Sequence, residues 1–204
     1  MKEIKSNEMA NDHYPNGAGI EVESSIMLNN EKIAVVFYEI VRNRLQHVNS
    51  WTIIAPGLGI NFQLVNRSGI EVYRKAQEGD LVRMVDMAHN SNRNGKIDWV
   101  RIDSLESSAG DSADNFAFNV QPSTNPVSNK FWGEQPQALI RATGGFSVSR
   151  VHAKVTASVC LHESNVKVNS EHVFDRQATV PFSSPFLLFN NLSWQALTDG
   201  LISR

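Results

Sequence analysis

The sequence predicts a single α+β domain, built from a mostly antiparallel β-sheet with one early and one late helix. Three observations predict it. Apolar residues follow helical spacing once, early in the chain; they alternate with polar residues in several later stretches; and a short segment that can form a helix closes the chain. The length of 204 residues and the hydrophobic fraction of 41% suit one globular domain.

The first elements follow a polar start. Residues 1–19 are predicted to be a flexible tail, and residues 20–204 to form the domain. Residues 20–28 are expected to form a short strand, and Asn29 or Asn30 can cap the helix that follows. The helix is indicated by apolar residues at helical spacing: Ile33, Val36, Phe37, Ile40, Val41, Leu45 and Val48.

Beyond Pro56 the hydrophobic period changes to two. Residues 60–64 and 70–74 are predicted to form a hairpin, followed by strands at 81–87, 97–105 and around Phe116, Phe118 and Val120. Gly144-Gly145 reads as a turn. Residues 151–161 alternate without a break, which predicts a strand with one face on the core. Ser193 can cap a last helix over 194–201.

Composition excludes several classes of protein. Lys and Arg number 19 and Asp and Glu 21, without a basic cluster, which argues against nucleic-acid binding. The single cysteine, Cys160, excludes an intramolecular disulfide and a thiolate metal cluster. The sequence shows neither a secretory signal nor an apolar run long enough to span a membrane, so we expect a cytoplasmic protein.

Residues 90–98 resemble a calcium loop in their spacing. Positions one, three and five are Asn90, Asn92 and Asn94, however, and Arg101 stands where a bidentate glutamate belongs. A hairpin turn at Asn94-Gly95 is therefore favoured over a calcium site. We expect neither a metal nor a cofactor.

Candidate catalytic groups are few. Cys160 and His162 share one face of the predicted strand, but a nucleophile and its base need an orienting third group. His152 lies ten residues from His162, too far along a strand for a shared metal. A solvated strand face explains these side chains, so no catalytic residue is assigned. An enzyme using His152 or His162 as a base remains a minor alternative.

Aromatic residues supply the candidate ligand-binding set. Phe62, Trp99, Phe116 and Phe118 lie in predicted strands and are expected to line the interior. Phe131 and Trp132 lie in the proline-stiffened stretch 122–136, where they can either close over a pocket or plug the open end of the sheet as ordinary core. We favour the plug.

Three segments in the middle of the chain carry a recognisable pattern: EGDLVRM at 78–84, DWVRI at 98–102, and VQP at 120–122 with NP at 125–126. This pattern resembles that of an uncharacterised family of bacterial proteins of similar length, and the resemblance implies no activity.

The element order, a short strand, a helix, a run of antiparallel strands and a late helix, is similar to that of the START-like helix-grip proteins. This resemblance implies a sheet that wraps a helix and leaves an apolar cavity for lipids, sterols or polyketides. The predicted architecture is thus either helix-grip-like or a half-open barrel.

The sequence favours a non-catalytic binder of an apolar small molecule, held in a cavity between sheet and helix. The alternative is a protein–protein interaction or structural module without ligand or activity. The ligand and the oligomeric state stay open.

Overall fold

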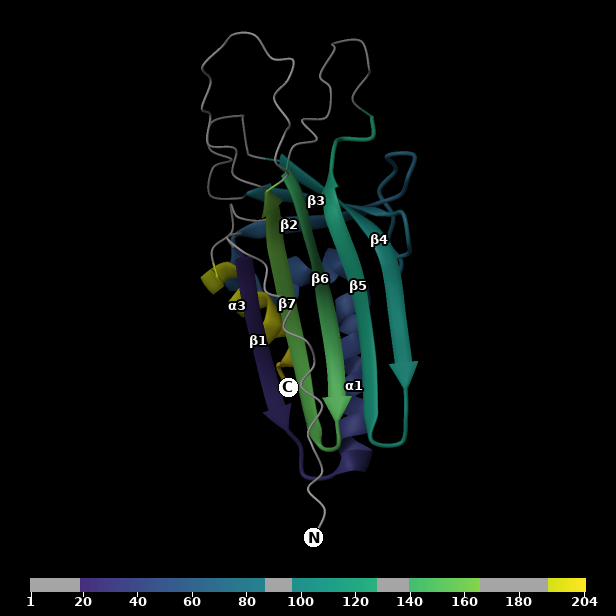
Figure 1. The fold of residues 1–204 in the computed structure, drawn as a ribbon, viewed down its shortest axis with the longest axis vertical. Helices are drawn as coiled ribbons and strands as arrows, with labels where there is room; N and C mark the ends of the chain where they lie inside the picture. The colour runs from purple at the N-terminus through teal and green to yellow at the C-terminus, as the bar shows by residue number, and fades with distance from the viewer. Residues whose placement is uncertain (1–18, 87–96, 128–139, 166–190) are drawn as a thin grey trace.

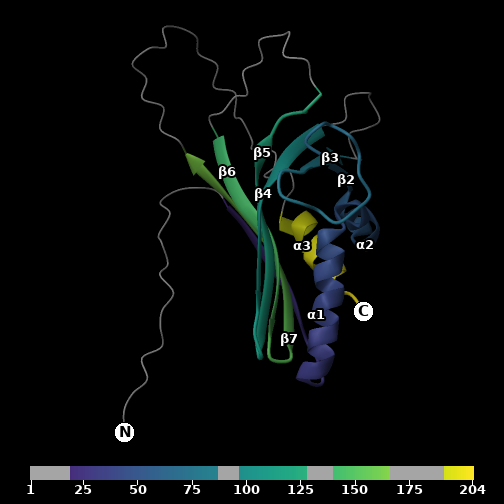
Figure 2. The same cartoon turned by 90° about the vertical axis from the view of Figure 1, so that its right-hand side faces the viewer.

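The chain forms one curled sheet with its helices gathered on the concave side (Figures 1 and 2). The computed structural model describes residues 19–86, 97–127, 140–165 and 191–204. The elements are β1 (Gly19–Met27), α1 (Glu31–Gln46), α2 (Trp51–Ile54), β2 (Ile60–Val65), β3 (Leu81–Asp86), β4 (Ile97–Ala109), β5 (Ala113–Ser123), β6 (Ile140–Val151), β7 (Lys154–Asn165) and α3 (Asn191–Ile202). The predicted α+β class, with an early and a late helix, is confirmed.

The strand order is β1-β7-β6-β5-β4-β3-β2, and neighbouring strands are antiparallel. The first strand pairs with the last, so that Val22 lies opposite Val159. Helices α1 and α2 stand between β1 and β2 in the chain and cross from one edge of the sheet to the other. Among the described residues β1 and β2 do not pair, so the sheet curls around its helices without closing. This is the helix-grip-like, half-open arrangement expected from the element order.

Two local features help the sheet to bend. The register of β4 and β5 shifts between Ile102 and Ser104, which leaves Asp103 as an extra residue and increases the local twist. Gly144 lies in β6 opposite Leu161, where a Cβ atom would stand 2.5 Å from the Leu161 Cδ2. The turn predicted at Gly144-Gly145 is therefore wrong, because these glycines instead allow close approach of neighbouring strands.

Helix α1 begins where the sequence indicated. The Asn30 side chain accepts a hydrogen bond from the Ile33 backbone N–H over 3.0 Å, which caps the first turn. The side chains that face the sheet form a single stripe: Ala34, Tyr38, Val41 and Leu45. Ile33, Val36 and Ile40, predicted to lie on the same buried face as Val41 and Leu45, lie on the exposed side instead.

The strand predicted over 151–161 is divided by a turn. Val151 ends β6, the chain reverses at His152 with a positive φ of 52°, and β7 begins at Lys154. The alternation within β7 is confirmed, since its inward side chains are buried: Val155, Ala157, Val159 and Leu161. The prediction overran the turn because the side-chain pattern continues through it.

The predicted hairpin of residues 60–64 and 70–74 forms only at its turn end, where the Asn66 N–H donates to the Ile70 carbonyl over 2.9 Å and the Val72 N–H to the Leu64 carbonyl over 3.0 Å. β2 pairs with β3, so that Phe62 lies opposite Met84, and residues 70–74 contribute one isolated bridge between Val65 and Glu71. A bidentate ion pair holds the intervening loop, because both Arg74 guanidinium Nη atoms bond the buried Asp80 carboxylate, at 2.6 and 2.9 Å. β2 thus pairs with β3 along its whole length and with residues 70–72 only at its end.

Helix α3 is attached to β1 through buried polar groups. The Ser24 hydroxyl lies 2.8 Å from the Thr198 hydroxyl, and Gln195 donates to Ser24 over 2.7 Å. Ser24 also donates to the Asp199 carboxylate. These bonds attach the last helix to the edge strand β1 on the concave side. The helix begins at Asn191, earlier than the predicted cap at Ser193.

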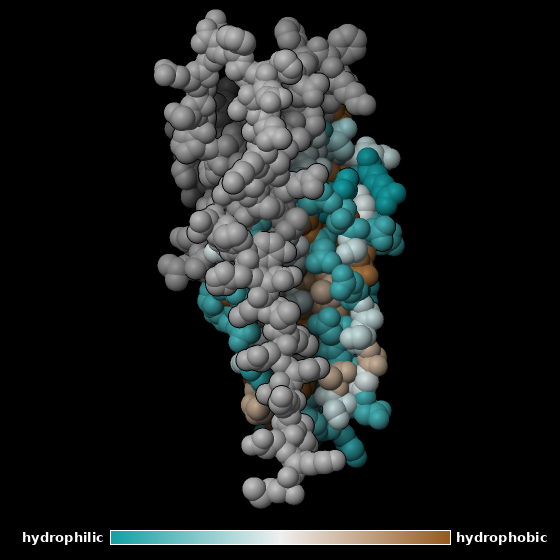
Figure 3. All heavy atoms as spheres, in the orientation of Figure 1, coloured by the Kyte–Doolittle hydropathy of each residue, from teal (hydrophilic) through white to brown (hydrophobic). Residues whose placement is uncertain are grey.

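The opposite, convex side of the sheet is mainly hydrophilic where the structure describes it (Figure 3). Asn119 donates from Nδ2 to the Ser104 hydroxyl at 2.9 Å and to the Glu106 carboxylate at 2.8 Å. The apolar core accordingly lies on the concave side.

Candidate functional site

Six aromatic rings gather on the concave side, between the sheet and helices α2 and α3. None is more than 3% exposed. They come from elements far apart in the chain: Trp51 of α2, Phe62 of β2, Phe116 and Phe118 of β5, Phe146 of β6 and Trp194 of α3. We call this set the aromatic cluster.

Trp51 lies at the centre of the aromatic cluster. Its ring stacks on Phe118 at a centroid distance of 6.0 Å and an interplanar angle of 6°, and it meets Phe62 edge-on at 5.2 Å. The indole N–H donates to the Leu45 carbonyl over 3.1 Å, so this polar atom is satisfied by the end of α1. The ring is therefore fixed by packing on one side and by a hydrogen bond on the other.

Trp194 covers the cluster from α3. Its ring centroid lies 5.5 Å from that of Phe146 and 6.4 Å from that of Phe62. Phe146 in turn lies 5.4 Å from Phe118. Because these separations are those of rings in contact, the aromatic cluster is packed as a continuous layer.

Of the predicted ligand-binding residues, Phe62, Phe116 and Phe118 lie in this cluster. Trp99 is only partly buried and lies on the other face of β4 from the buried Val100. The exposed Arg101 shares the strand parity of Trp99, and this was the signal in the sequence that could have excluded it. Phe131 and Trp132, like the predicted Asn94-Gly95 turn, lie outside the described residues.

Three members of the cluster were missed from the sequence: Trp51, Phe146 and Trp194. Phe146 could have been found, because Phe146 and Val148 alternate with Ser147 and Ser149. Trp51 and Trp194 lie in short helices whose docking positions depend on the distant strands.

Charged groups lie at the margin of the cluster. The Arg42 guanidinium carbon stands 5.1 Å from the centroid of the Phe116 ring, a cation–π contact. Burial raises the pKa of Tyr38 to about 12, with smaller opposing effects from Arg42 and Asp114. The rings themselves offer apolar contact surface.

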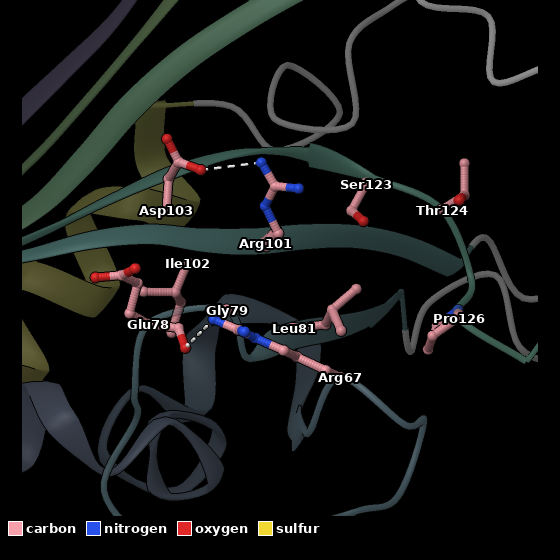
Figure 4. A pocket seen from close by; sticks show the side chains of 10 residues that line it. All are labelled: Arg67, Glu78, Gly79, Leu81, Arg101, Ile102, Asp103, Ser123, Thr124 and Pro126. Atoms are coloured by element: carbon pink, nitrogen blue, oxygen red, sulfur yellow. Dashed lines mark hydrogen bonds and ion pairs between the residues drawn. The ribbon is translucent and has the colours of Figure 1, made fainter.

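A separate hollow of about 490 Å³, lined by both charged and apolar side chains, lies between β4 and the loop before β3 (Figure 4). Two guanidinium groups line it, and each is bonded to the protein: Arg67 donates to the Glu78 carbonyl over 3.1 Å, and Arg101 to the Asp103 carboxylate over 2.9 Å. Since two acidic side chains, Glu78 and Asp103, also line the hollow, its formal charges balance. This hollow therefore has no clear preference for an anion or a cation.

The structure brings Cys160 and His162 together on the convex side, with 3.0 Å between Sγ and Nε2. A cysteine nucleophile needs a lowered pKa. Burial, and secondarily the Glu21 carboxylate on β1, instead raises the pKa of the Cys160 thiol. His152 lies at the β6–β7 turn, 2.8 Å from the Glu31 carboxylate. Both histidines are exposed and stand outside the aromatic cluster, so neither pair forms an activated catalytic arrangement with it.

Within the described ranges, no group of three or more His, Cys, Asp or Glu side chains is placed to hold a metal ion. Nor is any helix described here long and apolar enough to cross a bilayer.

Comparison with known proteins finds solved structures that are similar in fold, but no related sequence. No protein-family model and no curated protein matches the chain, so membership of the expected bacterial family stays a prediction. The chain is similar in structure to a hypothetical protein from Helicobacter pylori, with a TM-score of 0.51 and 11% identity over 99% of this chain and 97% of that one. At this identity the likeness concerns the fold alone.

Two further solved structures are similar to it. One is a major latex-like protein from Panax ginseng, with a TM-score of 0.38 and 15% identity over 90% of this chain and 95% of that one. The other is an aromatase/cyclase from a Streptomyces species, with a TM-score of 0.39 and 9% identity over 91% and 92%.

Proposed function

We propose that this protein is a non-catalytic binder of an apolar small molecule, which binds on the concave side of the sheet. The observation that supports this proposal is the aromatic cluster, which joins strands β2, β5 and β6 to helices α2 and α3. Ring faces and edges bind flat apolar molecules through the same contacts that they make with each other. A planar or polycyclic ligand is therefore the best chemical match.

The rings are already in contact, so a ligand enters by displacing a ring. Trp194 is the ring that we expect to move. It belongs to α3, a helix of 12 residues at the end of the chain, which the Ser24 and Gln195 bonds attach to the edge strand β1. In this proposal the ligand takes over the contacts of Trp194 with Phe62 and Phe146.

Native mass spectrometry on protein purified gently from its own host tests this function. The expected result is a discrete mass above that of the 22.7 kDa chain, which is lost on denaturation. Trp194→Leu should raise the occupied fraction, because it removes the ring that competes with the ligand for Phe62 and Phe146. Trp99→Leu is the matched control, because it removes the same side chain from the other face of the sheet, and it should leave the occupied fraction unchanged.

An apo mass for the wild-type protein would contradict the proposal, and so would an adduct that folded Trp194→Leu or folded Trp99→Leu loses. Thermal melts of both variants show whether each is folded under the conditions of the measurement.

The second candidate function is an interaction module, and a different observation favours it. Helix α1 exposes a group of large apolar side chains, of which Val36 is 63% exposed. Contiguous apolar surface of this kind is typical of protein-binding sites.

A further inference from the structure

Helix α1 carries two apolar stripes, of which the sheet covers one. The second stripe consists of Ile33, Val36, Phe37 and Ile40, and we call it the exposed α1 stripe. Ile33 is 47%, Val36 63% and Ile40 45% exposed, while Phe37 is half-buried and connects the stripe to the core. Figure 2 shows α1 on the concave side, with its far side turned away from the sheet.

The spacing of the exposed α1 stripe is that of a helix-packing surface. Its members stand at i, i+3, i+4 and i+7, which places them on one side of the helix over two turns. Single exposed apolar residues need no explanation, whereas a contiguous stripe indicates a binding surface. A second helix can pack along it with coiled-coil-like geometry.

The charges beside the stripe identify the partner. Lys32 and Glu39 lie on the same flank, seven residues apart, and both are exposed. The Glu39 carboxylate also pairs with Arg42 of its own helix at 3.3 Å, and it remains 58% exposed. On one helix they are separated by about 10 Å of rise, too far to pair with each other. When two copies of α1 lie antiparallel, each Lys32 faces Glu39 of the other copy. The dipoles of the two helices then point in opposite directions, which is also electrostatically favourable.

We propose that the exposed α1 stripe docks a second copy of this chain, with the two α1 helices antiparallel about a two-fold axis. Ile33 of each copy then packs against Ile40 of the other, Val36 lies near the axis, and two Lys32–Glu39 ion pairs flank the seam. A two-fold axis requires such a self-complementary surface. The inference gives the second candidate function a partner and is independent of ligand binding.

The interface is expected to be weak. A single helix pair is small compared with the roughly 1,200–2,000 Å² that stable interfaces bury. The dimer should therefore dissociate on dilution, and its flanking ion pairs should make it weaker at high salt.

Sedimentation equilibrium over a range of protein concentrations tests the inference. The wild-type protein should show a reversible monomer–dimer equilibrium. Val36→Glu brings two carboxylates together near the axis and should abolish the dimer. Ile70→Glu is the matched control, because Ile70 is 62% exposed but lies in the loop between β2 and β3. It should leave the dimer unchanged.

Charge exchange identifies the pairing. Lys32→Glu and Glu39→Lys should each raise the dimer dissociation constant, by about tenfold if the two lost pairs are together worth about 1.4 kcal/mol. A mixture of the two variants should form heterodimers, since every flanking pair is then of opposite charge. Both substitutions in one chain should restore the homodimer. Lys154→Glu, at an exposed position on β7, controls for net charge.

A wild-type protein that stays monomeric at all concentrations would overturn the inference. So would equal weakening by Val36→Glu and Ile70→Glu, or a mixture of charge variants that forms no heterodimer. These outcomes do not bear on ligand binding, because a bound ligand adds its own small mass whereas association doubles the mass of the chain.

Discussion

Arg150 on β6 donates a hydrogen bond from Nε to the Asp114 carboxylate on β5 over 2.6 Å, and the Arg150 side chain is 1% exposed. The same guanidinium donates from Nη2 to the carbonyls of Gly110 and Asp111, at 3.2 and 3.3 Å. One buried cation thus ties the β4–β5 turn to the end of β6. Breaking such a pair is costly because it leaves a buried charge without its counterion.

We therefore expect Asp114→Ala to lower the free energy of unfolding by about 3–5 kcal/mol. The double variant Arg150→Met/Asp114→Ala should lose less than Asp114→Ala alone, since it removes the uncompensated charge. Urea unfolding of the two variants measures the difference. Equal losses would show that the guanidinium is satisfied without Asp114.

Gly200 lies where α3 meets the end of α2. A Cβ atom at this position would stand 2.2 Å from the Ile54 carbonyl oxygen. Gly200→Ala should destabilise the protein, because about 1–3 kcal/mol of overpacking exceeds the ~1 kcal/mol gain in helix propensity. It should also shift the fluorescence of Trp194 by moving α3.

Gly57→Ala is the control for this substitution, since a Cβ at Gly57 would have no neighbour within 4 Å. It should leave the thermal midpoint nearly unchanged. If Gly200→Ala is equally harmless, Gly200 of α3 is not in close contact with the Ile54 carbonyl of α2.

The buried Tyr38 should make stability fall at alkaline pH. Burial raises the pKa of Tyr38 to about 12, whereas a tyrosine in an unfolded chain titrates near pH 10. Between these values the unfolded state loses the proton and the folded state keeps it, so unfolding becomes more favourable as pH rises. Urea unfolding from pH 9 to pH 12 should show a smaller loss of stability in Tyr38→Phe than in the wild type. Tyr73→Phe, at a side chain that is 79% exposed, should behave like the wild type.

The Cys160 thiol should react slowly in the folded protein at neutral pH. Burial, and secondarily Glu21, raises its pKa, which leaves little thiolate to react. Reaction with a disulfide reagent should be much faster in denaturant, and Glu21→Gln should accelerate it less than unfolding does. A folded protein that reacts as fast as the denatured chain would instead indicate an activated Cys160–His162 pair.

Local pattern determined the individual elements. The alternation in β7 and the Asn30 cap of α1 depend on residues close in the chain, so the sequence alone predicts them. The order of strands and helices was likewise enough to predict a helix-grip-like, half-open sheet.

Contacts between distant residues decided which helix face is buried, which strands pair and which rings form the aromatic cluster. Helix α1 has two apolar stripes, and packing against the sheet selected the one containing Ala34 and left Val36 exposed. β2 pairs with β3 along its whole length and with residues 70–72 only at its end, and Trp51 and Trp194 join one aromatic cluster through Phe62. Strand pairing and helix docking thus join segments far apart in the chain. Periodicity therefore identifies helices, strands and apolar stripes, whereas the choice of which stripe is buried depends on the free energy of packing in the whole fold.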